Sequence, residues 1–566
     1  MANENIKIIV QEVDETRAKG SGASSDIVYV PGLAHQLTGY EYTNKPILCS
    51  DVDEFESYFG TEPYKLTETD VEQCSNYVTM NVGDYDKSYI YAKELLNAGL
   101  SVLYEAVCPE ENSLENVATF ETVENEKGFE GVFEKLHGLS NIFTIKALEE
   151  KTGKIKFRLT NMSRYGDVTL LLRSNSSVEL TKVTLPTPTL SKMTASEITD
   201  NNKCVISWTD TEVNNLEIVL DIRASGTGDF SLCLVHGTDL TSSVISGDTP
   251  LLHFYKTYGD RLDNLKDKNE YTVKYITNGG YPSFVLIDND RPIAVKMLDC
   301  AASRNDAVAL IDHKDDRGKT LFGDDSIYED VNDFFVNAAN TEFGAMFTPW
   351  GEYSCATLNQ STLQSMPASF GYLLCLAKAI KTSPNWLAMA GVTRGIVPGL
   401  QRLKTDKVLS NVIAENYQPK YGDLGQSNVV SINAITNVKP YGLTIWGNRT
   451  LKPVSVDGTV ATNFLNIRNM MSDIKKLAYN TAKSLMFEQD SDTLWLRFKS
   501  GVSPLLEQLK SGNGIVDYKI IKSDKKHNGN ALTRGEMAAV IKIFPLYPVE
   551  YFEITVVVSD NDVAVS

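Results

Sequence analysis

The stretch from Tyr441 to Leu451 constrains the fold more than any other part of this sequence. It reads Tyr-Gly-Leu-Thr-Ile-Trp-Gly-Asn-Arg-Thr-Leu, which predicts a strand that Gly447 and Asn448 end with a turn. A helix is expected from about Asn463 to Leu485, because apolar side chains recur there at three- and four-residue steps. The pattern predicts a compact domain near the C-terminal end, with no nucleophile, metal or phosphate-binding motif in it.

The composition is that of a folded protein with several domains. The chain has 566 residues, of which 42% are hydrophobic and 22% charged. A formal net charge of −19 argues against general binding of nucleic acid, which needs clustered lysine and arginine. No signal-peptide pattern opens the sequence, and no apolar run reaches the ~18 residues of a membrane helix. The eight cysteines form no CxxC pair, so we expect reduced thiols and synthesis in a cytoplasm.

Both ends of the chain carry a strand pattern with little around it. The first strand pattern is followed by a Gly- and Ser-rich linker at 18–25, and the last spans 551–558. A lone strand needs a sheet edge, in its own subunit or in another, to satisfy its backbone groups. A frayed terminus is the alternative for the first one. The side chains that such strands would contribute are Ile6, Ile8, Val10, Phe552, Ile554 and Val556.

Between the two ends, an α/β pattern is interrupted by a β-rich insertion. Capped helices are predicted at 50–60 and 88–98, and a strand at 26–32 is expected to end in a Pro-Gly turn. Further buried strands are predicted at 101–107, 283–287 and 307–311. From about 111 to 279 strand patterns dominate, at 142–147, 156–160, 168–173, 204–208 and 216–222.

A search for catalytic and ligand-binding motifs yields no candidate. The six histidines are far apart, and none has the spacing of a metal site. Arg317-Gly-Lys-Thr320 resembles the end of a phosphate loop, but His313 stands where the loop needs a glycine. No Gly-x-Ser-x-Gly elbow is present. We therefore predict no catalytic residue, no cofactor and no metal, although a Ser-His-Asp group formed only in space stays open.

The segment from Tyr441 to Leu451 resembles the signature of contractile tail sheath proteins. In that family a strand ending in Trp-Gly-x-Arg-Thr-Leu precedes a turn and a long helix, and Phe464–Asn469 resembles the opening of that helix. Asn469 departs from the pattern, since the family commonly has a second arginine there. Downstream, 502–514 resembles the family's late short helix and 544–552 the approach to its last strand. The resemblance covers about 26–108 and 285–558.

The resemblance implies an α+β multidomain fold. An α/β middle domain would carry a β-rich outer insertion, followed by an α+β C-terminal domain, with N- and C-terminal arms that donate strands to other subunits. The expected division is an N-terminal arm at 1–25, a middle sheath domain at 26–110 and 280–435, the insertion at 111–279, the C-terminal inner domain at 436–548 and a C-terminal arm at 549–566.

The resemblance also implies a structural function. Family members polymerise as stacked hexameric rings in a helical sleeve around a tail tube. The sleeve contracts to drive the tube through a cell envelope. The implied partners are other copies of the chain, the tail tube protein, and the baseplate and tail terminator proteins, in a virion tail or a related injection system. Phage, bacteriocin and secretion apparatus stay open. The alternatives are a multidomain hydrolase and a static virion tube or capsid protein.

Two residue sets near the signature carry further expectations. Trp446 and Arg449 are predicted to serve packing and register, since no chemistry surrounds them. The helix after the signature is basic in an acidic chain, so one of its faces is a candidate contact for an acidic tube or neighbouring subunit. A solvated helix face is the alternative. The residues of this predicted basic face are Arg468, Lys475, Lys476 and Lys483.

Overall fold

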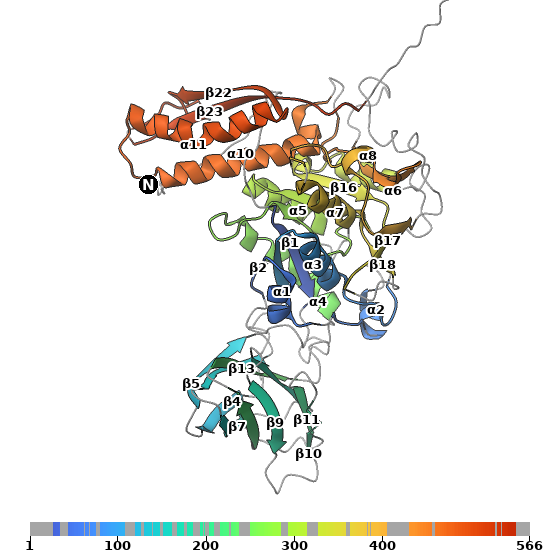
Figure 1. Ribbon diagram of the computed structural model, residues 1–566, viewed down its shortest axis with the longest axis vertical. Helices are drawn as coiled ribbons and strands as arrows, with labels where there is room; N and C mark the ends of the chain where they lie inside the picture. Colours follow the sequence, from blue (N-terminus) through green and yellow to red (C-terminus); the bar gives the residue numbers. More distant parts are fainter. Residues whose placement is uncertain are drawn as a thin grey trace, which may run out of the picture.

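A computed structural model describes residues 26–550, and it shows a mixed α+β architecture (Figure 1). The two sheets of the insertion lie at one end, a large sheet with helices occupies the middle, and two long helices with a β-hairpin form the other end (Figure 1). Gaps in the description fall at 34–43, 62, 67, 75–79, 108–118, 126–128, 138–139, 148–150, 161–166, 175–177, 185–192, 196, 199–202, 209–214, 226–227, 237–249, 285–291, 314–326, 358–362, 382, 385, 405–429, 455–458, 527–528 and 534.

The middle of the molecule is an eight-stranded sheet in the order β2-β3-β1-β14-β15-β16-β20-β21. Its six inner strands run parallel, and the two edge strands are antiparallel to their neighbours. Every residue of β1, β3, β15 and β16 is buried, as expected for parallel strands that are covered on both faces. The bounds are β1 Val28–Leu33, β2 Ile47–Cys49, β3 Val102–Val107, β14 Tyr275–Ile276, β15 Val308–Asp312, β16 Gly344–Thr348, β20 Asn433–Val438 and β21 Gly442–Ile445.

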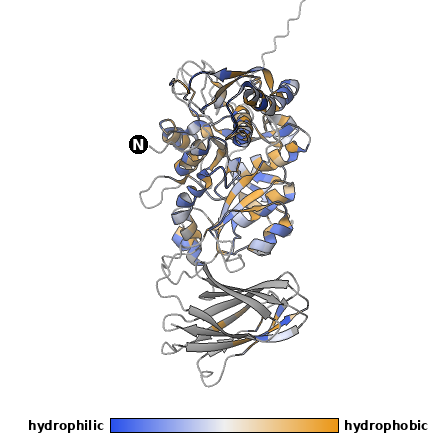
Figure 2. Cartoon of the chain, turned by 90° about the vertical axis from the view of Figure 1, so that its left-hand side faces the viewer, coloured by the Kyte–Doolittle hydropathy of each residue, from blue (hydrophilic) through white to orange (hydrophobic). Residues whose placement is uncertain are grey.

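Helices cover both faces of this sheet, and Figure 2 shows hydrophobic residues concentrated in the sheet and the helices beside it. Helices α1, α3 and α7 share one apolar core with Val28 and Val30, while α2, α4, α5 and α6 share the other with Tyr29. The predicted helices at 50–60 and 88–98 are confirmed. Asp51 and Asp86 cap their N-termini, and Gly60 and Gly99 end them. The bounds are α1 Val52–Phe59, α2 Glu68–Cys74, α3 Lys87–Ala98, α4 Pro250–Arg261, α5 Ile293–Arg304, α6 Ile327–Phe335, α7 Ala368–Ile380 and α8 Gly391–Arg394.

Two antiparallel sheets are built from the strands between Thr119 and His236. One has six strands in the order β10-β11-β8-β13-β6-β5, and the other four in the order β4-β7-β12-β9. All five strands predicted from the sequence of this region are found. A smaller sheet beside α7 has the order β18-β17-β19. The bounds are β4 Thr119–Asn125, β5 Phe129–His137, β6 Ser140–Ala147, β7 Lys151–Thr160, β8 Asp167–Ser174, β9 Val178–Thr184, β10 Met193–Ala195, β11 Lys203–Trp208, β12 Asn215–Ala224, β13 Gly228–His236, β17 Gly351–Ser354, β18 Leu363–Met366 and β19 Leu400–Leu403.

One expectation about the middle sheet is wrong, and a second falls mostly outside the described residues. Strand β1 does not end at Pro31-Gly32 but runs on to Leu33, and Gly32 is needed there because an added Cβ would lie 1.8 Å from the Tyr104 hydroxyl. The strand predicted at 283–287 is not formed by Ser283 and Phe284, and its remaining residues lie outside the described part. Strand β14 at Tyr275–Ile276 takes the place between β1 and β15 instead.

The C-terminal end consists of α10 (Leu465–Ser484), α11 (Asp492–Ser511) and a hairpin of β22 (Ile515–Ser523) and β23 (Ala538–Pro545). The late short helix expected at 502–514 is in fact the second half of α11. This helix begins after Ser491, whose side chain accepts a hydrogen bond from the Leu494 amide at 3.2 Å. Pro504 lies inside the helix, which the sequence pattern did not anticipate.

Helix α10 is attached to the middle sheet by buried charged groups. The Lys274 ammonium lies 3.0 Å from Asp473 of α10 and also pairs with Asp26, and all three side chains are at most 7% exposed. Burial alone would lower the pKa of Lys274, but the two carboxylates outweigh it and raise that pKa. Lys274 therefore stays charged and joins the start of the described chain, the middle sheet and α10.

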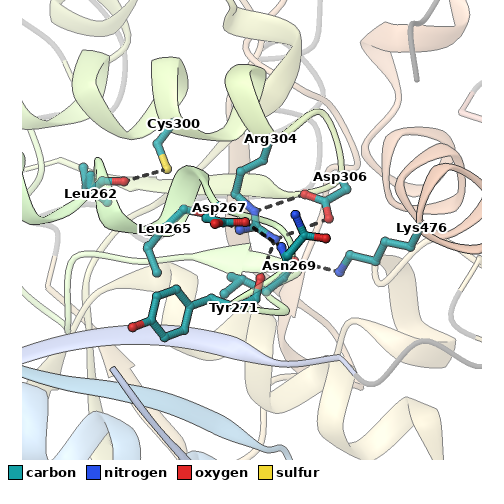
Figure 3. Close-up of polar contacts among 10 residues, drawn as sticks. Leu262, Leu265, Asp267, Asn269, Tyr271, Cys300, Arg304, Asp306 and Lys476 are labelled. Carbon is teal, nitrogen blue, oxygen red and sulfur yellow. Dashed lines mark hydrogen bonds and ion pairs between the residues drawn. The ribbon is translucent and has the colours of Figure 1, made fainter. Parts of the chain in front are cut away.

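A second buried lysine of α10, Lys476, is bound by a backbone carbonyl. Lys476 Nζ donates to the Val273 carbonyl at 2.7 Å, beside the Arg304–Asp306 pair (Figure 3). The Arg304 guanidinium binds Asp306 at 3.1 Å and donates to the carbonyl of Tyr271 at 3.0 Å (Figure 3). Burial lowers the pKa of Lys476 to about 8.

The close contact at Gly32 predicts a destabilised Gly32→Ala variant. The Tyr104 ring is held between Phe55 and Phe59, with centroid distances of 5.0 and 4.6 Å, so it has little room to move away from a new methyl group. Overpacking of this kind costs about 1–3 kcal/mol of unfolding free energy. Urea unfolding followed by fluorescence measures the loss. Tyr104→Phe removes the atom nearest to the new methyl group. The variant with both Gly32→Ala and Tyr104→Phe should therefore lose less unfolding free energy than the sum of the losses in the two single variants. Losses that simply add would contradict the contact.

The position of Lys476 predicts how stability changes with pH. Below pH 8 its ammonium is charged in the folded and the unfolded chain, so the cost of burial is fully present. Between about pH 8 and 10.5 the folded chain releases the proton while the unfolded chain keeps it, so stability from this group rises with pH. The unfolding free energy of Lys476→Met minus that of the wild type should therefore fall over this range. Lys483→Met, at an exposed position of the same helix, is the control, and a constant difference for Lys476→Met would refute the assignment.

Candidate assembly interface

The β22–β23 hairpin is a two-stranded sheet with no further strand on either backbone edge among the described residues. In the described part of the chain, β22 and β23 pair only with each other. One face packs on α11 through Tyr518, Ile520, Ile541 and Ile543, which are partly buried against the apolar core of this end. Unpaired strand edges are templates for the addition of a further strand. The hairpin can therefore accept a strand from another segment on either side.

A tryptophan from the middle region fixes the end of α11 beneath the hairpin. The Trp386 indole nitrogen donates to the Gly512 carbonyl at 3.2 Å. A Cβ at Gly512 or Gly514 would lie 2.5 or 2.7 Å from the indole ring, so both glycines permit its close approach. Asn466 of α10 donates to the Trp386 carbonyl at 3.1 Å. These contacts hold α10, α11 and the hairpin together as one platform.

A buried arginine of the middle region binds Glu550, the last described residue. Arg449 is 4% exposed, and its guanidinium makes a two-point contact with the Glu550 carboxylate, including Nε to Oε1 at 2.9 Å. The same guanidinium lies 4.4 Å above the Phe464 ring at the start of α10. Phe464 in turn packs edge-on against Tyr547. Bidentate arginine–carboxylate pairs fix orientation as well as distance, so the root of the C-terminal segment has a defined position.

The predicted signature strand is confirmed as β21, antiparallel to β20, although Trp446 lies just beyond its end. The Trp446 amide donates to the Ala434 carbonyl at 2.7 Å, and its side chain is half-buried against the core of the middle sheet. The Arg449 amide donates to the Asn433 side chain at 2.7 Å. These contacts agree with a packing and register role for Trp446 and Arg449, which stays a prediction until the variants are made.

The predicted basic face of α10 needs correction. Arg468, Lys475 and Lys476 are at most 8% exposed in this structure, so they face the chain's own middle region and not the solvent. The Arg468 guanidinium stacks 4.3 Å above Phe343, and Lys475 Nζ donates to Asn305 Oδ1 at 2.7 Å. The remaining cation, Lys483, is exposed and donates to Asn269 Oδ1 at 2.9 Å.

The six predicted strand donors lie outside the described residues. These are Ile6, Ile8, Val10, Phe552, Ile554 and Val556. The described residues nearest to them are Asp26 and Glu550, and each carboxylate is paired with a buried cation, Lys274 or Arg449. The points at which both terminal segments join the body are therefore fixed.

The hydrolase alternative gains no support from the buried polar groups at the ends of the parallel strands. Asp312, His313 and Ser369 are all buried there, but the Ser369 hydroxyl donates directly to Asp312 Oδ2 at 2.7 Å. His313 Nε2 lies 3.4 Å from Asp330 instead, and all three residues are at most 1% exposed. A hydrolase triad needs the imidazole between serine and carboxylate, next to substrate. Among the described residues, no group of side chains could hold a metal ion, and no helix is long and apolar enough to cross a membrane.

Sequence reasoning missed Lys274, Trp386 and Glu550. Lys274 interrupts the apolar run Val273-Lys274-Tyr275-Ile276, and a charge inside a buried strand pattern is a usable signal for an internal ion pair. Trp386 and Glu550 carry no such signal, because their partners are 126 and 101 residues away along the chain.

Comparison with known proteins adds a sequence match at this same end of the chain. Residues 459–559 match the family described as phage tail sheath C-terminal domain, and this segment contains α10, α11 and the hairpin. The tail sheath protein of Vibrio phage KVP40 is 22% identical over 182 residues, or 32% of this chain. The matched part spans 25% of that relative's length.

Solved structures of similar description are more distant. The sheath of the extracellular contractile injection system PVC in its contracted state has 16% identity and a TM-score of 0.36, covering 52% of this chain and 74% of that one. The sheath tail protein of Desulfitobacterium hafniense has 10% identity and a TM-score of 0.41, covering 95% and 100%. Residues 459–559 therefore resemble the C-terminal domain of phage tail sheath proteins, and 32% of the chain aligns with one tail sheath protein.

Proposed function

We propose that this chain is the subunit of a contractile tail sheath. It polymerises as stacked hexameric rings around a tail tube, and contraction of the sleeve drives the tube through a cell envelope. The match of residues 459–559 to the sheath C-terminal domain carries this proposal. The same segment holds the β22–β23 hairpin, which provides a means of linking subunits without a bound nucleotide or cofactor.

Strand addition is the proposed link. Ile6, Ile8 and Val10 of one neighbour and Phe552, Ile554 and Val556 of another would supply inward side chains to the hairpin edges. The fixed roots at Asp26 and Glu550 support this arrangement, because an arm with a defined starting point reaches a limited set of positions. The domain division at 1–25, 26–110, 111–279, 280–435, 436–548 and 549–566 belongs to the same proposal.

The partners follow from the proposed role. They are further copies of the chain, the tail tube protein, and the baseplate and tail terminator proteins, within a phage tail or an injection system that assembles in a bacterial cytoplasm. Lys483 is the one residue of the predicted basic face that remains exposed, so it is the member that we retain as a contact for an acidic tube or subunit surface.

Electron microscopy of the purified full-length chain tests this function. A contractile sheath subunit should form sleeves or stacked rings, with tubes present, in two lengths that differ in subunit packing. A static tube or capsid protein would show a single length. A chain that stays monomeric with tubes present, at concentrations where relatives polymerise, would contradict the proposal.

The Arg449–Glu550 contact predicts a variant that folds but assembles poorly. Glu550→Gln keeps the shape of the side chain and removes its charge, so the arm root loses a bidentate ion pair to a buried guanidinium, a kind of contact worth about 1.5–3 kcal/mol. Because the Glu550 side chain is about a third exposed, we expect the loss at the lower end of that range. The yield of sleeves after ultracentrifugation should fall, while circular dichroism stays unchanged. Glu536→Gln, which breaks a carboxylate–lysine pair at the hairpin turn, is the control, and equal yields from both variants would exclude a special role for Glu550.

A further inference from the structure

The outward face of the hairpin presents two lysines directly opposite each other. Lys519 of β22 is the register partner of Lys542 of β23, and both are exposed. Beside them Ile521 is opposite Val540, with exposed fractions of 42% and 41%. Like charges directly opposite on one face destabilise a sheet, because their Cβ atoms are about 4.5–5.5 Å apart. This face therefore combines positive charge with apolar surface in a chain of net charge −19.

A strand added to either edge would extend both faces of the hairpin. Side chains alternate between the faces of a sheet, so one half of the new strand's side chains would continue the α11-packed face. The other half would lie beside Lys519 or beside Lys542, depending on the edge that accepts the strand. The two faces thus favour an apolar set on one side and a set containing an anion, rather than a further cation, on the other.

The C-terminal segment of a second copy fits this pattern. Residues 551–566 contain Glu553, Asp560 and Asp562 and neither lysine nor arginine. In an extended strand, Phe552, Ile554 and Val556 share one face, and Glu553 lies on the other with Thr555 and Val557.

The N-terminal segment fits this pattern of apolar and acidic side chains less well. If Ile6, Ile8 and Val10 face α11, then Lys7 lies on the lysine side and adds a like charge to it. The side chain that would lie beside the lysine pair is therefore positively charged in the N-terminal arm and negatively charged in the C-terminal arm.

We propose that Lys519 and Lys542 select the acidic C-terminal segment of a neighbouring copy, with Glu553 on the lysine side of the hairpin, over the N-terminal segment at that edge. This proposal rests on the proposed sheath function and names the residues that decide which arm docks where. The alternative is that these lysines only prevent strand addition, as lysines on edge strands commonly do. In that case the hairpin would bind neither arm in preference to the other.

Binding of labelled peptides to the dispersed full-length chain tests the proposal at low salt. The probes are synthetic peptides of residues 549–566 and of residues 1–17, measured by fluorescence anisotropy. One of the two variants Lys519→Glu and Lys542→Glu, the one at the edge that accepts the strand, should weaken binding of the C-terminal peptide about three- to tenfold, as expected for reversing one cross-strand charge contact. Binding of the N-terminal peptide should be unchanged or tighter. Lys499→Glu, an exposed lysine of α11, is the matched control and should affect neither peptide.

Charge exchange then identifies the edge. A C-terminal peptide with Glu553→Lys should bind the wild type weakly and regain affinity for the variant whose lysine it faces. Rescue in Lys519→Glu assigns the β22 edge, and rescue in Lys542→Glu assigns the β23 edge. No rescue in either variant, equal weakening of both peptides, or no binding of the C-terminal peptide would overturn the proposal. Normal sleeves from the wild type would leave the sheath function standing in each of these cases, whereas the absence of sleeves contradicts the sheath function itself.

Discussion

A single buried ammonium group holds the main parts of this chain in place. Lys274 belongs to the segment that enters the middle sheet, and it binds both Asp26 at the start of the described chain and Asp473 of α10. Removing one member of such a group would leave an uncompensated charge in the interior, at a cost of about 3–5 kcal/mol. The C-terminal platform is therefore oriented on the middle sheet by a polar contact that tolerates few alternative arrangements.

Helix α10 also links the two ends of the body. Its first residues lie at the Arg449–Glu550 pair, through Phe464, and its middle lies at Lys274, through Asp473. Nine residues of helix separate these two positions, which corresponds to about 14 Å. Under the proposed function, a load between the neighbour bound to one arm and the neighbour bound to the other would pass through this short, continuous piece of helix.

The sequence predicted those elements whose signals are local. Asp51 with Gly60, and the Gly99 stop, mark helices within a few residues, and the apolar run in β15 is what a parallel strand buried on both faces requires. Features that depend on distant partners were not predictable. Gly32 is required by its close contact with Tyr104 and not by a turn. Lys476 donates a hydrogen bond to a carbonyl 203 residues away, so a helix face that looks solvated in the sequence is buried. The platform was predicted from its signature, but Trp386 and Glu550, which fix it, were not.

In the middle sheet, the polar groups at the carboxyl ends of the parallel strands are bound by other groups of the chain itself. In α/β sheets, ligands bind at the carboxyl ends of the parallel strands. Here Asp312 at the end of β15 is engaged by Ser369, and the Trp350 indole donates to the His313 carbonyl at 2.9 Å, so the chain's own side chains occupy these polar groups. Under the proposed function, the contacts between subunits lie instead at the backbone edges of the hairpin. Backbone hydrogen bonds are independent of side-chain identity, so in that function a subunit would keep them while the rest of its body moved as a rigid unit.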